Sequence, residues 1–367
     1  ETSTPTLRVL RERDIRNVLD VRTGLEIVER TFRDYGSGNT QRLSDPASMF
    51  GGSGLSGAAK FKIKGATLMT EQVTGFRLVS DLPARHGFHS YHLLFVYDDR
   101  TGAPIGLLDE TWLHRFRTAL TCVVAARYLA RPESRTVALI GAGAIAAELF
   151  PALTDSFDLE EVRVVARRLE SAQQFCRKLD GRFGPRFVAV DGAGAAIDGA
   201  DIVITLTFAE QPIVLPGMLA PGSFLCSMGE TEEVDIGVLD EVDRLIVDEF
   251  DYATVLGDIA VWLQKGLAER DQLEQRVDAH IGEIVAGNSP ARQTPVERIF
   301  AIIQGAACEG EDCVSPGSGP LALAISAWLM WTVLAIGAAT VEVFRRGFSV
   351  TLGIAYGVGV GLLSIVV

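Results

Sequence analysis

The stretch VALIGAGAIAAEL, residues 137–149, constrains the fold more than any other part of this chain. Its first half is an apolar run typical of a buried strand, and its second half has the spacing of a helix. Between them lies a G-x-G-x-x-A pattern, in which Gly141 permits a tight turn, Gly143 lets the backbone approach a pyrophosphate, and Ala146 lets the helix pack closely on the strand. The pattern predicts a dinucleotide-binding turn whose helix N-terminus faces the phosphates. Its predicted cofactor contacts are Gly141, Gly143, Ala144, Ile145 and Ala146.

Strands and helices alternate after this turn. Apolar strands are expected at 161–167, 186–190 and 200–207, with a helix LESAQQFCRKL between the first two. Such alternation predicts an α/β fold with a Rossmann-type doubly wound parallel sheet. The nicotinamide half of a cofactor would pass the carboxyl ends of the later strands. The predicted contacts there are Thr205, Leu206, Thr207, Met228 and Gly229.

The end of the second strand bears on which nicotinamide nucleotide would bind. An enzyme that uses NAD(H) usually has a carboxylate there for the ribose hydroxyls, whereas this strand ends in Arg167 and Arg168. Two guanidinium groups suit the 2'-phosphate of NADP(H). NADP(H) is therefore favoured, with NAD(H) as the alternative. The other interpretation of the two arginines is that both are solvated loop residues that bind no ligand.

The residues in front of the nucleotide domain have a different pattern. Alternating apolar residues in FKIKG, GFRLV and HLLFVYD predict antiparallel strands, DDRTG predicts a hairpin turn, and the block up to residue 130 predicts a helix. We therefore expect an α+β substrate-binding domain at 1–130 and a Rossmann domain with return helices at 131–314. The histidines show no convincing metal spacing, so no metal site is expected, and His89 and His92 are interpreted as surface or edge residues.

Charge and cysteine content limit the kinds of partner and the cellular compartment that we expect. The 34 Lys and Arg against 47 Asp and Glu leave a net charge of -13, which argues against nucleic acid as a partner and favours a small molecule. The five cysteines are odd in number and lack the spacing of a zinc site or disulfide framework. They are expected to be small buried side chains in a reducing compartment, and no secretory signal is recognised, so a cytoplasmic location is expected.

The C-terminal residues 315–367 form an apolar tail with helical character. Within 320–367, two apolar segments flank Arg345 and Arg346, and each is long enough to cross a bilayer. A membrane hairpin is one interpretation, and a pair of buried core or interface helices is the other. Membrane association through this tail therefore stays open.

Several segments together resemble the ornithine cyclodeaminase and mu-crystallin family. They are RTAL with VAARYLA, GAGAIA, ADIVITLT and GETEEVD, which follow the family's order over residues 7–307. The resemblance implies a fold of two domains, a homodimer formed through the N-terminal domain, and hydride transfer between a nicotinamide ring and the alpha carbon of an amino or imino acid.

The resemblance also implies roles for single residues. Arg117 matches the family arginine that binds the substrate carboxylate, although a salt bridge between elements is the alternative. Arg77 lies where the cyclodeaminases keep a lysine, and an arginine cannot act as a base at neutral pH. Lys64 on the adjacent strand can supply the missing amine, and Arg42 can help to hold a carboxylate.

Glu230 is the departure that matters most for the reaction. The cyclodeaminases carry an aspartate after the glycine at this point, and Glu230 retains a carboxylate with one more methylene of reach. The favoured function is an NAD(P)-dependent ketimine reductase or amino-acid dehydrogenase, with Glu230, Lys64 and Arg77 as catalytic candidates. The alternatives are a cyclodeaminase that releases ammonia from ornithine or lysine, and a non-catalytic NADP-dependent binding protein like mu-crystallin.

Overall fold

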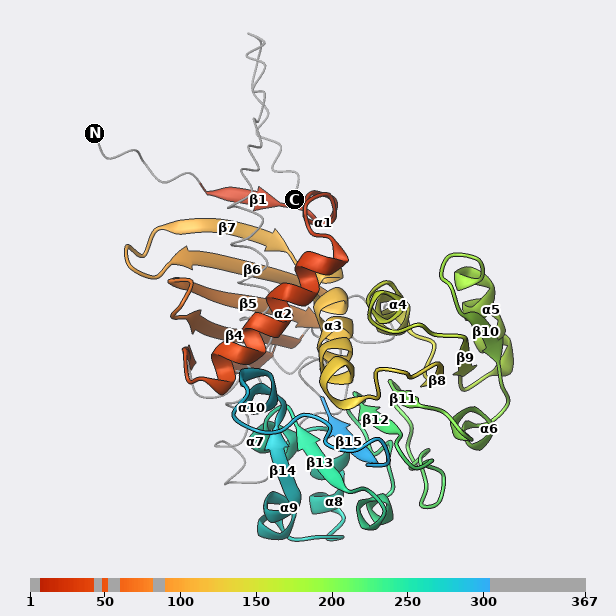
Figure 1. Cartoon of the computed structure of the whole chain (residues 1–367). Coiled ribbons are helices and arrows are strands. Elements are labelled where there is room, and N and C mark those ends of the chain that lie inside the picture. Colours follow the sequence, from red (N-terminus) through yellow and green to blue (C-terminus); the bar gives the residue numbers. More distant parts are fainter. Residues whose placement is uncertain (1–6, 43–47, 52–59, 82–89, 304–367) are drawn as a thin grey trace, which may run out of the picture.

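The computed structural model describes residues 7–42, 48–51, 60–81 and 90–303 (Figure 1). The tail at 315–367, and with it the predicted membrane contact of 320–367, lies outside the described residues. Among the helices that are described, none combines the length and apolar character needed to cross a bilayer.

The N-terminal part is built on a mixed sheet that has seven strands within the described residues, in the order β1-β7-β6-β5-β4-β2, with β3 also paired to β4. The predicted antiparallel strands are confirmed, since β4, β5 and β6 pair antiparallel over nearly their whole length. The strands are β1 (Arg8–Leu10), β2 (Thr40–Arg42), β3 (Ser48–Gly51), β4 (Lys60–Leu68), β5 (Val73–Asp81), β6 (Ser90–Asp98) and β7 (Pro104–Asp109).

Helices cover one face of this sheet. They are α1 (Glu12–Arg16), α2 (Val21–Gly36) and α3 (Thr111–Leu129), and Figure 1 shows α2 and α3 lying across the strands. Side chains alternate between the two faces of a strand. On β5 and β6 the alternation places Arg77 with Val79, and His92 with Leu94, on the buried face.

The second sheet is the predicted parallel one. Its eight described strands run in the order β10-β9-β8-β11-β12-β15-β13-β14 and all pair parallel. This confirms the Rossmann-type sheet. The strands are β8 (Thr136–Ile140), β9 (Glu161–Val165), β10 (Arg186–Ala189), β11 (Ile202–Thr205), β12 (Phe224–Ser227), β13 (Arg244–Val247), β14 (Val277–His280) and β15 (Ile299–Ile302).

Three strands are shorter than predicted. β9 ends at Val165 rather than at 167, β10 ends at Ala189 rather than at 190, and β11 covers 202–205 rather than 200–207, because the residues that flank these runs lie in the connecting loops. The predicted helix LESAQQFCRKL is found as α5. The remaining helices are α4 (Ala144–Ser156), α5 (Leu169–Leu179), α6 (Ala193–Ile197), α7 (Phe250–Ala253), α8 (Gly257–Gln264), α9 (Arg270–Arg276), α10 (Ile281–Ala286) and the 3-10 helix η2 (Ile236–Asp240).

The two sheets share one core. Helix α3 lies between them, against β6 on one side and against α4 and β12 on the other (Figure 1). The predicted role of cysteines as small buried side chains is confirmed for Cys122, Cys176 and Cys226, whereas Cys308 and Cys313 lie outside the described residues. The domain boundary at residue 130 falls at the end of α3 and stays a prediction.

The close packing of α2 against α10 can be tested by substitution. A Cβ at Gly36 would lie 2.1 Å from the carbonyl oxygen of Gly282, and backbone cannot give way as a flexible side chain can. We expect Gly36→Ala to lower the free energy of unfolding by about 1–3 kcal/mol through overpacking. The measurement is chemical unfolding. Gly194→Ala is the control, because the added methyl meets nothing nearer than 3.9 Å, and an equal stability of both variants would contradict the packing argument.

Candidate active site

The turn between β8 and α4 has the geometry that a dinucleotide needs. Gly141 has a φ of +117°, and a Cβ there would lie 2.3 Å from the carbonyl oxygen of Leu206. Gly143 precedes the first turn of α4, and no atom lies within 4 Å of a Cβ built on it, so its backbone faces open space. Ala146 is fully buried where α4 packs on the sheet. The three small residues therefore have the conformation and packing that a phosphate-binding turn requires, and their contact with a cofactor stays a prediction.

The arginines predicted to bind a 2'-phosphate follow the neighbouring strand. β9 ends at Val165, Arg167 is exposed in the loop, and Arg168 is the exposed residue directly before α5. Both guanidinium groups are thus available at the carboxyl end of the strand next to β8.

A buried carboxylate connects the two loops predicted to receive nicotinamide. Glu233 accepts hydrogen bonds from the Thr205 hydroxyl at 2.7 Å and from the Thr207 amide and hydroxyl at 2.5 and 2.7 Å. It also accepts from the Gly229 amide at 2.8 Å and from Ser227 Oγ at 3.2 Å. Glu233 therefore ties the end of β11 to the end of β12. Glu233 is not among the residues predicted from the sequence, because nothing in the acidic run GETEEVD indicates which carboxylate turns inward.

The other glutamates of that run lie differently. Glu230 is 9 % exposed in the loop after β12, and its backbone carbonyl accepts from the amide of Gly257. Glu232 forms an ion pair with Lys265 at the end of α8. Met228 is buried beside Gly229. Glu230 thus lies at the edge where the Rossmann sheet would meet a substrate, and its catalytic role stays a prediction.

A cluster of charged and imidazole groups is buried between the N-terminal sheet and α3. Arg77 is 1 %, Arg117 2 % and Glu110 0 % exposed. Arg77 Nη2 lies 2.5 Å from Glu110 Oε1. Glu110 also donates its backbone N–H to the carbonyl of His92 at 2.9 Å, which ties the start of α3 to β6. We call these residues the arginine cluster: Arg77, His92, Glu110, His114 and Arg117.

Each histidine of the arginine cluster is hydrogen-bonded to one of the two arginines. His92 Nδ1 is hydrogen-bonded to Arg77 Nη2, and His114 Nδ1 lies 2.8 Å from Arg117 Nη2. A guanidinium can only donate, so each Nδ1 accepts from its arginine. The rings pack against each other at 4.6 Å between centroids. The cluster therefore brings two guanidinium cations, one carboxylate and two imidazoles together.

Burial and mutual repulsion act on these charges. Burial, and then the charge of Arg77, lower the pKa of Arg117 to about 9, against the opposing effect of Glu110, so Arg117 is a cation at neutral pH. Tyr252 and Asp248, which follow β13, lie near enough to act on the same charge. Arg117 is thus placed beside the carboxyl edge of the Rossmann sheet, where a substrate carboxylate would need a cation.

The interpretation of His92 as a surface or edge residue is wrong. His92 is buried, because the alternation of β6 places it on the same face as Leu94 and Val96. His114 and Glu110 were missed altogether. A signal was present, since positions 110 and 114 are spaced so that they share one helix face with Arg117, which is a predicted site residue. His89 lies outside the described residues.

Lys64 and Arg42 are placed only by their strands. Lys64 pairs directly with Arg77 in the register of β4 and β5, as expected from adjacent strands. Arg42 pairs with Ala66 of β4. Their side chains are not among those described, and their substrate-binding roles stay predictions.

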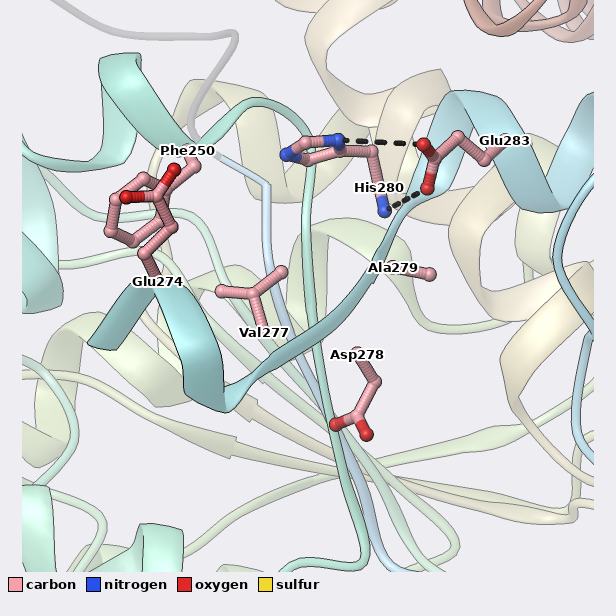
Figure 2. A pocket seen from close by; sticks show the side chains of 7 residues that line it. All are labelled: Phe250, Glu274, Val277, Asp278, Ala279, His280 and Glu283. Carbon is pink, nitrogen blue, oxygen red and sulfur yellow. Dashed lines mark hydrogen bonds and ion pairs between the residues drawn. The ribbon is translucent and has the colours of Figure 1, made fainter. Parts of the chain in front are cut away.

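A separate hollow lies beside β14 and α10 (Figure 2). His280 and Glu283 form a capping box at the start of α10, with the His280 amide donating to Glu283 Oε2 at 3.0 Å. Burial lowers the pKa of His280, which favours its neutral form. Within the part of the chain described, no group of three metal-binding side chains occurs.

The buried ion pair predicts a large effect on stability. Burial raises the pKa of Glu110, but the charge of Arg77 and the neighbouring His92 lower it more, so the net pKa lies below 4.5. Its contribution is present above the ordinary pKa and is lost as the pH falls through the folded value. We expect Glu110→Gln to lower the free energy of unfolding at pH 7 by about 3–5 kcal/mol, because Arg77 loses its carboxylate.

Glu26→Gln is the control for this prediction. Glu26 pairs with Arg22 on the surface, where both side chains are largely exposed, so we expect less than about 1 kcal/mol. Denaturant unfolding measures both variants. Similar small losses would show that Glu110 does not compensate Arg77.

Comparison with known proteins agrees with this geometry. The chain is 28 % identical over 212 residues to a Delta(1)-pyrroline-2-carboxylate reductase of Bacillus cereus, an alignment that spans 56 % of this chain and only 63 % of that reductase. The fold is similar to that of the Thermococcus litoralis Delta(1)-pyrroline-2-carboxylate reductase in complex with NADH and L-proline, with a TM-score of 0.76, 21 % identity, and coverage of 93 % of this chain and 98 % of that one.

A second solved structure has the same fold, an archaeal alanine dehydrogenase dimer with bound NAD, with a TM-score of 0.74, 22 % identity, and coverage of 93 % of this chain and 97 % of that one. The profile of the "Ornithine cyclodeaminase/mu-crystallin family" matches residues 7–309. The chain therefore belongs to the ornithine cyclodeaminase/mu-crystallin family, which confirms the resemblance found in its sequence.

Proposed function

We propose that this protein is an NAD(P)-dependent oxidoreductase that moves a hydride between nicotinamide and the alpha carbon of an amino or imino acid, as a ketimine reductase or amino-acid dehydrogenase. The observation that carries the proposal is the position of Arg117, a buried cation at the carboxyl edge of a parallel sheet whose β8–α4 turn fits a dinucleotide. The named relatives, a reductase of a cyclic imino acid and an alanine dehydrogenase, support it.

The residues of the chain divide the work. Arg117 binds the substrate carboxylate with paired donors, and Arg77, held by Glu110, keeps the second positive charge nearby. Glu230 or Lys64 holds the proton that keeps the imine cationic, since the carbon of a C=N group protonated on nitrogen is the better hydride acceptor. A bound nicotinamide supplies or accepts the hydride, and the chain contributes orientation and charge.

We further propose NADP(H) as the preferred cofactor and a homodimer as the working form. Arg167 and Arg168 support the cofactor choice through their position after β9. The dimer is supported by the sheet face opposite α2 and α3, where the rings of Phe76 and Phe95 stack at 4.8 Å and Tyr97 lies beside them, all only half-buried. An apolar sheet face left partly open in one chain is typical of an interface.

A direct assay tests the reaction. The full chain is mixed with NADPH or NADH and either a cyclic ketimine carboxylate or pyruvate with ammonia, and absorbance of the reduced nicotinamide is followed. Continuous consumption supports the oxidoreductase. Binding without consumption supports the mu-crystallin alternative, and ammonia release from ornithine without net change of cofactor supports the cyclodeaminase.

The proposed role of Arg117 in binding the substrate carboxylate can be tested by substitution. We expect Arg117→Met to lower kcat/KM by roughly 100-fold or more, because a buried charged hydrogen bond to the carboxylate is worth about 2–5 kcal/mol. Steady-state kinetics measure the effect, with thermal unfolding to verify the fold. Arg127→Met on the same helix is the control, since Arg127 pairs with Glu29 at the surface and should leave kcat/KM unchanged. Equal activity of all three proteins would refute the role of Arg117.

The cofactor preference has its own test. We expect the double variant Arg167→Ala, Arg168→Ala to raise the KM for NADPH by about tenfold or more, because two charge-assisted contacts to the 2'-phosphate are lost. The KM for NADH, which lacks that phosphate, should stay the same. If both cofactors are affected equally, or neither is, the two arginines do not select NADP(H).

A further inference from the structure

Glu233 and Asp258 form a pair of buried carboxyl groups joined by Ser227. Ser227 Oγ lies 2.5 Å from Asp258 Oδ2 and 3.2 Å from Glu233 Oε2. Asp258 lies in the first turn of α8 and is fully buried, as is Glu233. The other oxygen of Asp258, Oδ1, accepts the backbone amides of Glu233 and Val234 at 2.7 and 2.8 Å.

The hydrogens around this pair can be counted. A serine hydroxyl has one hydrogen, so Ser227 cannot donate to both carboxyl groups at once. Two ionised carboxylates would leave one buried acceptor facing the lone pairs of the hydroxyl. Glu233 already accepts from Thr205, Thr207 and Gly229, which suits its ionised form. Asp258 Oδ2 is thus the oxygen suited to carry a proton. It donates this proton to Ser227 Oγ, while the serine hydroxyl donates its own hydrogen to Glu233.

The surrounding charges do not replace this proton. Burial, and then the nearby charge of Glu233, raise the pKa of Asp258 from 3.8 to about 7. Among the described residues of α8, its C-cap and the loops after β11, β12 and β13, Lys265 is the one cation, and it pairs with Glu232. Apart from Glu233 and Asp258, the other charged side chains on those segments are all acidic: Glu210, Glu230, Glu232, Asp235, Asp248 and Glu249.

We propose that Glu233, Ser227 and Asp258 are positioning residues of the cofactor site, which share one proton and thereby hold together the two loops that receive the nicotinamide half. The proposal rests on the proposed function, because those loops matter only if a nicotinamide nucleotide binds. Loss of the proton sets two buried carboxylates against one hydroxyl, weakens the hold of Glu233 on Thr207 and Gly229, and loosens the site. Nucleotide binding should therefore require the protonated pair.

The first consequence is a pH dependence of binding. With one proton required, the affinity for NADH should be constant below about pH 7 and should then fall toward a limiting slope of about tenfold per pH unit. NADH is the probe because it lacks the 2'-phosphate, whose own titration near pH 6 would interfere. Binding is measured from pH 6 to 8.5, and Arg117, whose pKa is about 9, starts to lose its proton only toward the end of this range.

The second consequence is seen without any ligand. The folded pKa of Asp258 lies above its ordinary value, so the folded state binds more protons between about pH 4 and 7. The stability that this group contributes is therefore full at low pH and is lost as the pH rises through that window. Thermal unfolding of the ligand-free protein reads this out independently of activity.

Two substitutions give opposite expected results. Asp258→Asn places an amide donor beside Ser227 and retains the oxygen that accepts both backbone amides, so it mimics the protonated group permanently. Its NADH affinity should match the wild type at pH 6 and stay constant to pH 8.5. Glu233→Gln directs an amide N–H at groups that themselves donate, so its affinity should fall by about tenfold or more at every pH.

A third variant and a control complete the experiment. Ser227→Ala removes the bridge, and we expect weaker NADH binding already at pH 6. Asp240→Asn removes an exposed carboxylate of η2 and should behave as the wild type. Binding is measured by quenching of protein fluorescence and by calorimetry on the full chain.

The outcomes separate the two proposals. If the wild type binds NADH with no pH dependence, or if Asp258→Asn titrates as the wild type does, the shared proton is refuted while the oxidoreductase proposal stands. If Glu233→Gln binds NADH as tightly as the wild type, the positioning role is refuted. If the wild type binds neither NADH nor NADPH at any pH, the proposed function fails and this inference fails with it.

Discussion

Two guanidinium groups held away from water are the constraint on which the candidate site depends. A buried cation is costly unless a carboxylate and hydrogen-bond acceptors compensate it. Glu110 supplies the carboxylate for Arg77, and the imidazoles of His92 and His114 supply the acceptors. Since Glu110 also bonds through its backbone to β6, the start of α3 cannot shift along the sheet without breaking this arrangement.

Helix α3 carries that constraint to the nucleotide domain. It packs against α4 and β12, so the distance between the arginine cluster and the β8–α4 turn is set by one helix. Arg117 lies at the point where α3 approaches Asp248 after β13. An enzyme that transfers hydride needs a substrate anchor and a cofactor turn at a constant separation, and a helix shared by both cores provides it.

The loops around the proposed nicotinamide position use a different solution to the same physical problem. In the arginine cluster, buried charge is balanced by an opposite charge. At Glu233 and Asp258, two acidic groups are buried together, and a single proton with several donors takes the place of a cation. The pKa of Asp258 lies at about 7, so the second arrangement titrates close to neutrality.

The sequence by itself determined the parallel sheet, the β8–α4 turn and the antiparallel strands, because apolar periodicity and the small residues Gly141, Gly143 and Ala146 follow from local steric rules. It also pointed to Arg77 and Arg117 through the family resemblance. Only the tertiary structure decided that His92 is buried, that Glu110 compensates Arg77, and that Glu233 turns inward. These outcomes depend on which charges meet across elements far apart in the chain, and no local pattern encodes that meeting.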